Sequence, residues 1–199
     1  MRKSVLATCL AIAAFFIWRP IAGAGERLAP AAAKQQIGIR AQAVLKALAH
    51  RHFAELASYV DPVKGLRFSP YAASDTDVVL TRDDLNSRAK LGRVRHWGDY
   101  DGSGEPIRMS FIKYYRRFVY DRDYLRAPQI GYDQFLGPEE ADEYERNYDD
   151  VYPHSIFVDY YIPRGLDTDE RPWSSLILVF QQSDGEWYLV GVIHDEWTV

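Results

Sequence analysis

A glycine-rich turn in the middle of the chain carries oxygen-bearing side chains at alternate positions. Asp99, Asp101 and Ser103 alternate with other residues, and Glu105 follows shortly after. Calcium takes six to eight hard oxygen ligands, and alternate acidic residues on a tight loop supply several of them. The twelfth position of such a loop would be Ser110, where calcium loops place a bidentate glutamate. The pattern leaves two readings open: a calcium site made by these four residues, or a polar loop that uses Asp and Gly for its turn geometry.

The end of the chain places a histidine beside two carboxylates, His194, Asp195 and Glu196. Neighbouring residues of a strand point to opposite faces, so His194 and Glu196 are predicted to share one face and Asp195 to take the other. His194 together with a carboxylate from another strand, such as Asp159, would form an acid–base pair. The alternative is structural, with His194 hydrogen-bonded at the sheet edge and Asp159 paired with an arginine, and structural pairs are commoner than catalytic ones.

Other motifs of site chemistry are missing from the sequence. The five histidines are His50, His52, His96, His154 and His194. They show no His-x3-His spacing, and the only cysteine is Cys9, so no zinc site is predicted. The sequence also contains no Gly-x-Ser-x-Gly elbow, phosphate loop or dinucleotide fingerprint. The 14 tyrosines suit either a ligand cleft or an ordinary half-buried sheet.

The N-terminus has the pattern of a secretory signal peptide. Arg2 and Lys3 precede an apolar run, residues 5–18, which is shorter than the roughly 20 residues of a membrane-spanning helix. The small residues Ala22 and Ala24 follow and indicate cleavage after Ala24. We therefore expect an exported chain, periplasmic or extracellular, with no membrane segment after cleavage. The alternative is a short uncleaved anchor.

Composition is that of a globular chain of 199 residues, long enough for one sizeable domain. A hydrophobic content of 47% and a charged content of 26% exclude a wholly disordered chain. Loss of the leader removes three basic residues and no acid, so the net charge falls from −4 to −7. An acidic chain without a basic stripe argues against nucleic-acid binding.

Periodicity predicts the elements that must position these residues. Residues 25–33 are a loose lead-in, and residues 34–199 form a single α+β domain. A helix is expected over 32–60, with a possible break at Gly38 and an end at the Asp-Pro pair of residues 61–62. Further elements are strands at 65–71, 78–80, 94–97, 156–162, 175–181 and 187–197, helices at 81–92 and 110–119, and a solvated acidic stretch at 137–150. The last two strands are joined by an Asp-Gly hairpin turn. The predicted fold is a long N-terminal helix packed on a curved antiparallel sheet.

Three segments resemble a group of uncharacterised bacterial exported proteins and lipoproteins. They are DPVKGLRFSPY at 61–71, HWGDYDGSGEPI at 96–107 and DGEWYLVGVIHDEWT at 184–198. The helix-then-sheet plan also looks like the cystatin-like cone shared by relatives of nuclear transport factor and ketosteroid isomerase. That resemblance implies a fold that hosts lyases, isomerases, hydrolases and plain binding domains, and it assigns no site residue.

We therefore expect an exported domain that binds a small molecule or a protein partner without catalysis. A pocket enzyme, a lyase, isomerase or hydrolase that uses His194 and Asp159, is the first alternative. A calcium-stabilised structural domain is the second.

Overall fold

A computed structural model describes residues 27–137, 148–166 and 171–197. The predicted signal peptide and most of the acidic stretch lie outside these residues. The elements in chain order are α1 (Pro30–Ala49), α2 (Phe53–Tyr59), β1 (Leu66–Ser69), β2 (Val78–Leu80), α3 (Arg82–Leu85), α4 (Arg88–Leu91), β3 (Val94–Asp99), β4 (Pro106–Ser110), α5 (Phe111–Phe118), the 3-10 helix η1 (Tyr124–Arg126), β5 (Gln129–Tyr132), β6 (Ser155–Ile162), β7 (Ser174–Ser183) and β8 (Glu186–Glu196). The α+β class expected from the sequence is confirmed.

The N-terminal helix is shorter than predicted and begins earlier. It starts at Pro30, inside the expected lead-in, because proline is well suited to the first turn of a helix. It ends at Ala49, where Arg51 takes a left-handed φ of 57° that a continuous helix cannot accommodate. The chain then forms the separate helix α2. Gly38 lies within α1 and does not break it.

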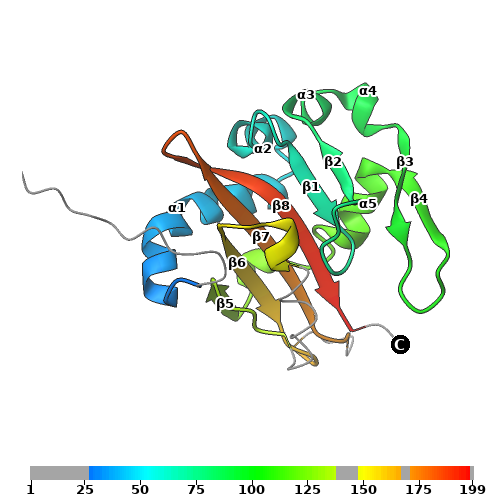
Figure 1. Ribbon diagram of the computed structural model, residues 1–199. Helices are drawn as coiled ribbons and strands as arrows, with labels where there is room; N and C mark the ends of the chain where they lie inside the picture. The colour runs from blue at the N-terminus through cyan, green and yellow to red at the C-terminus, as the bar shows by residue number, and fades with distance from the viewer. Residues whose placement is uncertain (1–26, 138–147, 167–170, 198–199) are drawn as a thin grey trace, which may run out of the picture.

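Six strands form the main sheet in the order β2-β1-β8-β7-β6-β5. All neighbours are antiparallel except β1 and β8, which run parallel, so the expected antiparallel sheet is in fact mixed. The turn between β7 and β8 has the predicted form, since Asp184 and Gly185 both take positive φ values, 50° and 82°. Strands β3 and β4 form a separate two-stranded ribbon at one side of the molecule (Figure 1).

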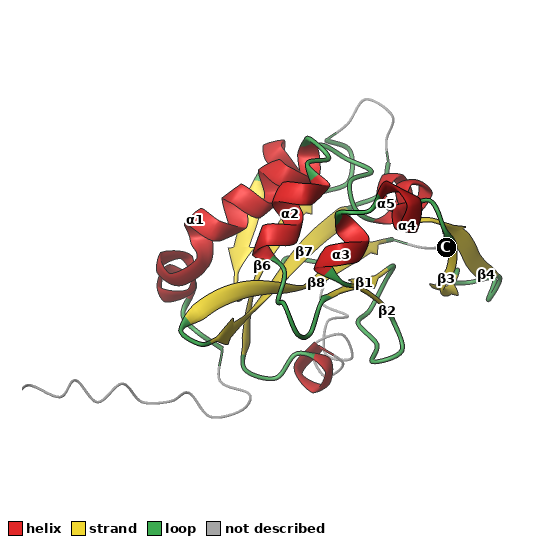
Figure 2. Cartoon of the chain, turned by 90° about the horizontal axis from the view of Figure 1, so that it is seen from above, coloured by secondary structure: helices red, strands yellow, loops and turns green. Residues whose placement is uncertain are grey.

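The helices cover one face of the sheet, as the view from above shows (Figure 2). Between them lies a large apolar core in which aromatic rings fill the interior. Trp97 stacks on Tyr114 with ring centroids 4.1 Å apart, and Phe111 packs edge-on against Phe68. Burial of a phenylalanine ring such as Phe68 or Phe111 contributes roughly 1.5–3 kcal/mol.

A smaller core covers the opposite face of the sheet. Phe157 lies at its centre, stacked on Phe135 at 4.1 Å, with Tyr148 against its edge. The helical turn at 148–151 supplies part of this cover (Figure 2). The guanidinium of Arg27 lies 5.1 Å from the centre of the Phe157 ring, and the ring face attracts this positive charge. Within the described ranges, no helix has the length and hydrophobicity needed to cross a membrane.

Candidate functional site

His194 and Asp159 lie on opposite faces of the sheet. His194 pairs with Leu176 of β7, whose side chain belongs to the core beneath the helices. Asp159 pairs with Ile177, which belongs to the smaller core on the other face. Side chains alternate between faces along a strand, so the sheet itself separates the two groups. The His194–Asp159 pair predicted from the sequence is therefore wrong, and this pair cannot carry acid–base chemistry.

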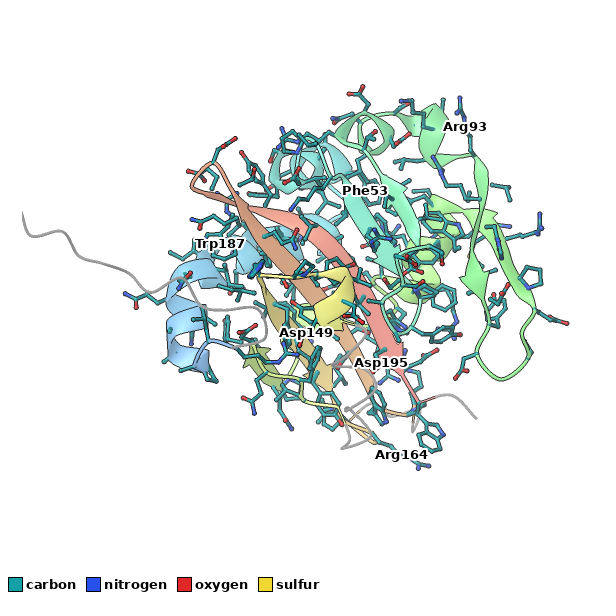
Figure 3. All side chains as sticks on the ribbon, viewed as in Figure 1. Phe53, Arg93, Asp149, Arg164, Trp187 and Asp195 are labelled. Atoms are coloured by element: carbon teal, nitrogen blue, oxygen red, sulfur yellow. The ribbon has the colours of Figure 1, made fainter. Side chains whose placement is uncertain are left out.

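Asp159 is held by backbone rather than by an arginine. Its carboxylate accepts a hydrogen bond of 2.8 Å from the Leu136 amide. Burial raises the pKa of Asp159 to about 6. The hydrogen bond from the Leu136 amide lowers this pKa, but by less than burial raises it. Asp195 lies on the same face near the end of β8 (Figure 3), and burial raises its pKa to about 7. Two carboxyl groups with raised pKa values therefore share this face.

The helix-covered face brings His194 together with two other carboxylates. His194 and Glu196 share that face, as predicted, and Asp121 approaches from the loop after α5. The ligand atoms of these three side chains all lie within 4.8 Å of one another. His194 is completely buried, whereas Asp121 and Glu196 keep some contact with solvent. Asp121 escaped the sequence analysis because a loop, not a strand, delivers it.

Hydrogen bonds and charge hold this cluster together. Arg117 of α5 donates to Glu196 at 2.5 Å. Tyr124 donates to Asp121 at 2.9 Å. Burial raises the pKa of Asp121, but the nearby charge of His194 and the hydrogen bond from Tyr124 outweigh it, so this pKa lies below its usual value. The carboxylate of Asp121 is therefore ionised at neutral pH.

Ser174 also lies near His194, yet the arrangement is not that of a hydrolytic triad. Ser174 Oγ is 3.5 Å from His194 Nε2, and Asp121 Oδ1 is 3.4 Å from the same nitrogen. In a triad the nucleophile and the orienting carboxylate contact different ring nitrogens. Here the other nitrogen, Nδ1, faces the carbonyl oxygen of Pro70 at 3.4 Å. The geometry gives His194 no position from which to activate Ser174.

The glycine-rich turn does not gather its oxygens at one point. Asp99 contacts His96 at 3.0 Å, and Asp101 accepts the amide of Gly102. The hydroxyl of Ser103 accepts the amide of Glu105. In residues 27–137, 148–166 and 171–197, these acids do not form a group with ligand atoms within 4.8 Å of one another. Calcium at this turn stays a prediction, and the hydrogen bonds are those of a polar loop.

A groove runs along the exposed side of α1. Its floor and walls come from α1, from Tyr132 of β5 and from Glu55 of α2. Lys34, Gly38, Gln42 and Lys46 of α1 are each four residues apart and form one row on the helix surface. Gly38 adds no side chain to this row, and a Cβ there would contact Lys34 at 3.4 Å and Tyr132 at 3.7 Å. A side chain at this position would therefore occupy part of the groove.

The groove combines apolar and cationic surface. Ile39 is 93% exposed at its side, and Ala43 and the Tyr132 ring add further apolar contact. Lys34 lies 5.5 Å from the Tyr132 ring. Within the described part of the chain, neither Lys34 nor Lys46 forms an ion pair. The sequence analysis missed this site, although the four-residue spacing of the row is visible in the sequence.

The comparisons with known proteins add no assignment to this geometry. Neither a scan against models of protein families nor a search of curated proteins gives a match.

Proposed function

We propose that the protein is an exported binding domain whose groove on α1 takes a small organic anion with an apolar body. The observation that carries this proposal is the row of Lys34, Gly38, Gln42 and Lys46, in which a glycine lies next to a lysine beside exposed apolar surface. The groove has a volume of about 520 Å³. Ligand sites for small molecules span roughly 300–1,000 Å³ and join apolar walls to a few polar groups.

The two lysines select the charge of the ligand. Among the described residues these ammonium groups form no ion pair, and each attracts an anion more strongly when the anion also excludes water from the groove. Glu55 contributes one negative charge at the rim, where it contacts His52 at 3.2 Å. Ile39 and Tyr132 then provide apolar surface for the body of the ligand. The expected class is an amphipathic carboxylate, sulfonate or phosphate.

A fluorescence titration with 8-anilinonaphthalene-1-sulfonate tests this proposal, because the dye has an aromatic body and one sulfonate. We expect saturable binding to the native protein and loss of at least tenfold in affinity in Gly38→Leu, which places a side chain in the groove. Leucine is a better helix former than glycine by roughly 0.5–1 kcal/mol, so the variant should melt no lower than the parent. Loss of binding with retained stability would separate the groove from the fold.

A pair of surface variants provides the matched control. Ile39→Asp places an acid in the groove, whereas Val63→Asp changes an equally exposed apolar residue elsewhere, 91% exposed. Only the first should weaken dye binding. Equal affinity in Gly38→Leu and the parent, or equal loss in both aspartate variants, would contradict the proposal.

Export and the cone fold belong to the same proposal. Cleavage after Ala24 would leave residues 27–197 of the structure in the mature chain. Intact mass of the protein recovered from the exported fraction should match a chain beginning at Gly25, and a mass retaining residues 1–24 would contradict cleavage. The cystatin-like cone is supported by helices on one face of a six-stranded sheet in the order β2-β1-β8-β7-β6-β5.

A further inference from the structure

The buried ring of His194 is surrounded by oxygen atoms that all lie beyond ordinary hydrogen-bond length. Nε2 is 3.4 Å from Asp121 Oδ1 and 3.5 Å from Ser174 Oγ, and Nδ1 is 3.4 Å from the Pro70 carbonyl oxygen. Ordinary N–H···O bonds are roughly 2.7–3.2 Å long. The side chain is 0% exposed, so solvent does not complete its contacts. The ring is thus positioned by its surroundings but not closely bonded to them.

Each ring nitrogen faces an acceptor, and Nε2 also faces the hydroxyl of Ser174. The Pro70 carbonyl only accepts, so a hydrogen bond to it places the ring proton on Nδ1. A neutral imidazole then leaves a lone pair on Nε2 between the Asp121 carboxylate, which only accepts, and the Ser174 hydroxyl, which can donate only across 3.5 Å. Two lone pairs facing each other in a buried place are unfavourable. A positive charge between Nε2 and Asp121 removes the conflict, either as a second ring proton or as a metal ion.

We propose that Asp121, His194 and Glu196 bind a divalent transition-metal ion of the zinc type. Zinc bonds to imidazole nitrogen and carboxylate oxygen are about 2.0–2.2 Å long. Two bonds of about 2.1 Å that span the 3.4 Å between Nε2 and Asp121 Oδ1 meet at an angle of about 108°, close to tetrahedral. Glu196 supplies a third ligand atom within 4.8 Å of the other two.

The residues around the cluster suit this role. Ligating histidines commonly donate their second N–H to a carbonyl, as Nδ1 is placed to do toward Pro70. Ligating carboxylates are themselves hydrogen-bonded, as Asp121 is by Tyr124. Because Asp121 and Glu196 keep some solvent contact, the fourth position opens on their side. Bound there, the ion would join the loop after α5 to the end of β8.

Arg117 competes with the metal for Glu196. Its guanidinium donates to Glu196 at 2.5 Å and must withdraw before that carboxylate can turn to an ion. This competition gives the proposal a signature that a purely structural cluster lacks. Arg117→Ala should bind metal at least tenfold more tightly than the parent, although it loses an ion pair of the fold.

The experiment uses chelator-treated full-length protein titrated with Co²⁺ and then with Zn²⁺. We expect visible Co²⁺ absorption typical of tetrahedral nitrogen and oxygen ligands, displaced by one equivalent of Zn²⁺, and a melting temperature raised by several degrees in excess Zn²⁺. Glu196→Gln, at the partly exposed side of the cluster, should weaken binding at least tenfold without unfolding the protein. His194→Gln adds a second test if it folds.

The exposed His96–Asp99 pair, with a contact of 3.0 Å, offers the matched control. His96→Ala should leave the Co²⁺ spectrum and affinity unchanged. Absence of the spectrum, equal affinity in Glu196→Gln and the parent, or loss of binding in His96→Ala would each overturn the proposal. In the first case, ¹⁵N spectra showing protons on both ring nitrogens of His194 would identify the cluster as an ion pair.

Discussion

Asp159 should destabilise the protein at neutral pH, and its replacement by asparagine should reverse this. The carboxyl group is 1% exposed and lies in the small core, where burial disfavours its charged form. Asparagine keeps the shape and an oxygen that can accept the Leu136 amide, which now donates at 2.8 Å. The substitution removes the charge and replaces one carboxylate oxygen by an NH2 group, so the change of the stability difference with pH isolates the cost of burying the charge.

The structure gives both the size and the direction of the effect. Burial raises the pKa of Asp159 from 3.8 to about 6, and each pKa unit is worth about 1.4 kcal/mol. Because the folded-state pKa is the higher one, the unfolded chain gives up its proton first as the pH rises. The free energy of unfolding therefore falls between pH 3.8 and 6, by about 3 kcal/mol in total. Below pH 3.8 the Asp159 carboxyl is protonated in both the folded and the unfolded chain, so its ionisation no longer lowers the free energy of unfolding.

Urea unfolding at pH 7.5 and pH 4 measures this. Asp159→Asn should be more stable than the parent by up to about 3 kcal/mol at pH 7.5 and by less than about 1 kcal/mol at pH 4. The exposed Asp150→Asn serves as the control and should show little difference at either pH. A stability difference that is the same at both pH values, or a parent more stable than the variant at pH 7.5, would refute the reasoning.

Two glycine positions give opposite expectations. Gly191→Ala should destabilise the protein by about 1–3 kcal/mol in thermal or urea unfolding, because a Cβ at Gly191 would lie 2.5 Å from the hydroxyl of buried Tyr152. Gly92→Ala should be neutral or stabilising by up to about 1 kcal/mol, since its φ of −75° suits alanine and the nearest atoms are 3.5 Å away. A Gly191→Ala variant as stable as Gly92→Ala would contradict the packing of Tyr152 over β8.

Short sequence patterns correctly predicted the elements that depend only on neighbouring residues. The Asp-Gly turn, the three long C-terminal strands and the helix start at Thr81 depend on a few neighbouring residues, and each is present. The break at Arg51 and the strand β5 were not predicted. A left-handed arginine is rare, and β5 is a short strand whose partner among the described residues is β6, so tertiary contacts decide both.

The sequence predicted the positions of the site residues only where the alternation of side chains along one strand determines them. That rule correctly placed His194 and Glu196 on one face. It could not show whether Asp159 of β6 shares a face with His194 of β8, because the register of β6 against β7 was unknown. Asp121 comes from a loop, and the histidine spacing that argued against zinc carries no information about a carboxylate delivered by tertiary structure.

The most direct test of the binding function is to map where the dye contacts the protein. Amide chemical shifts of ¹⁵N-labelled protein, recorded during titration with 8-anilinonaphthalene-1-sulfonate, should change most at Lys34, Gly38, Ile39 and Tyr132, which line the groove. The account predicts a single patch centred on Gly38. Changes centred instead on another exposed apolar residue, such as Val94, or no changes at saturating dye, would contradict it.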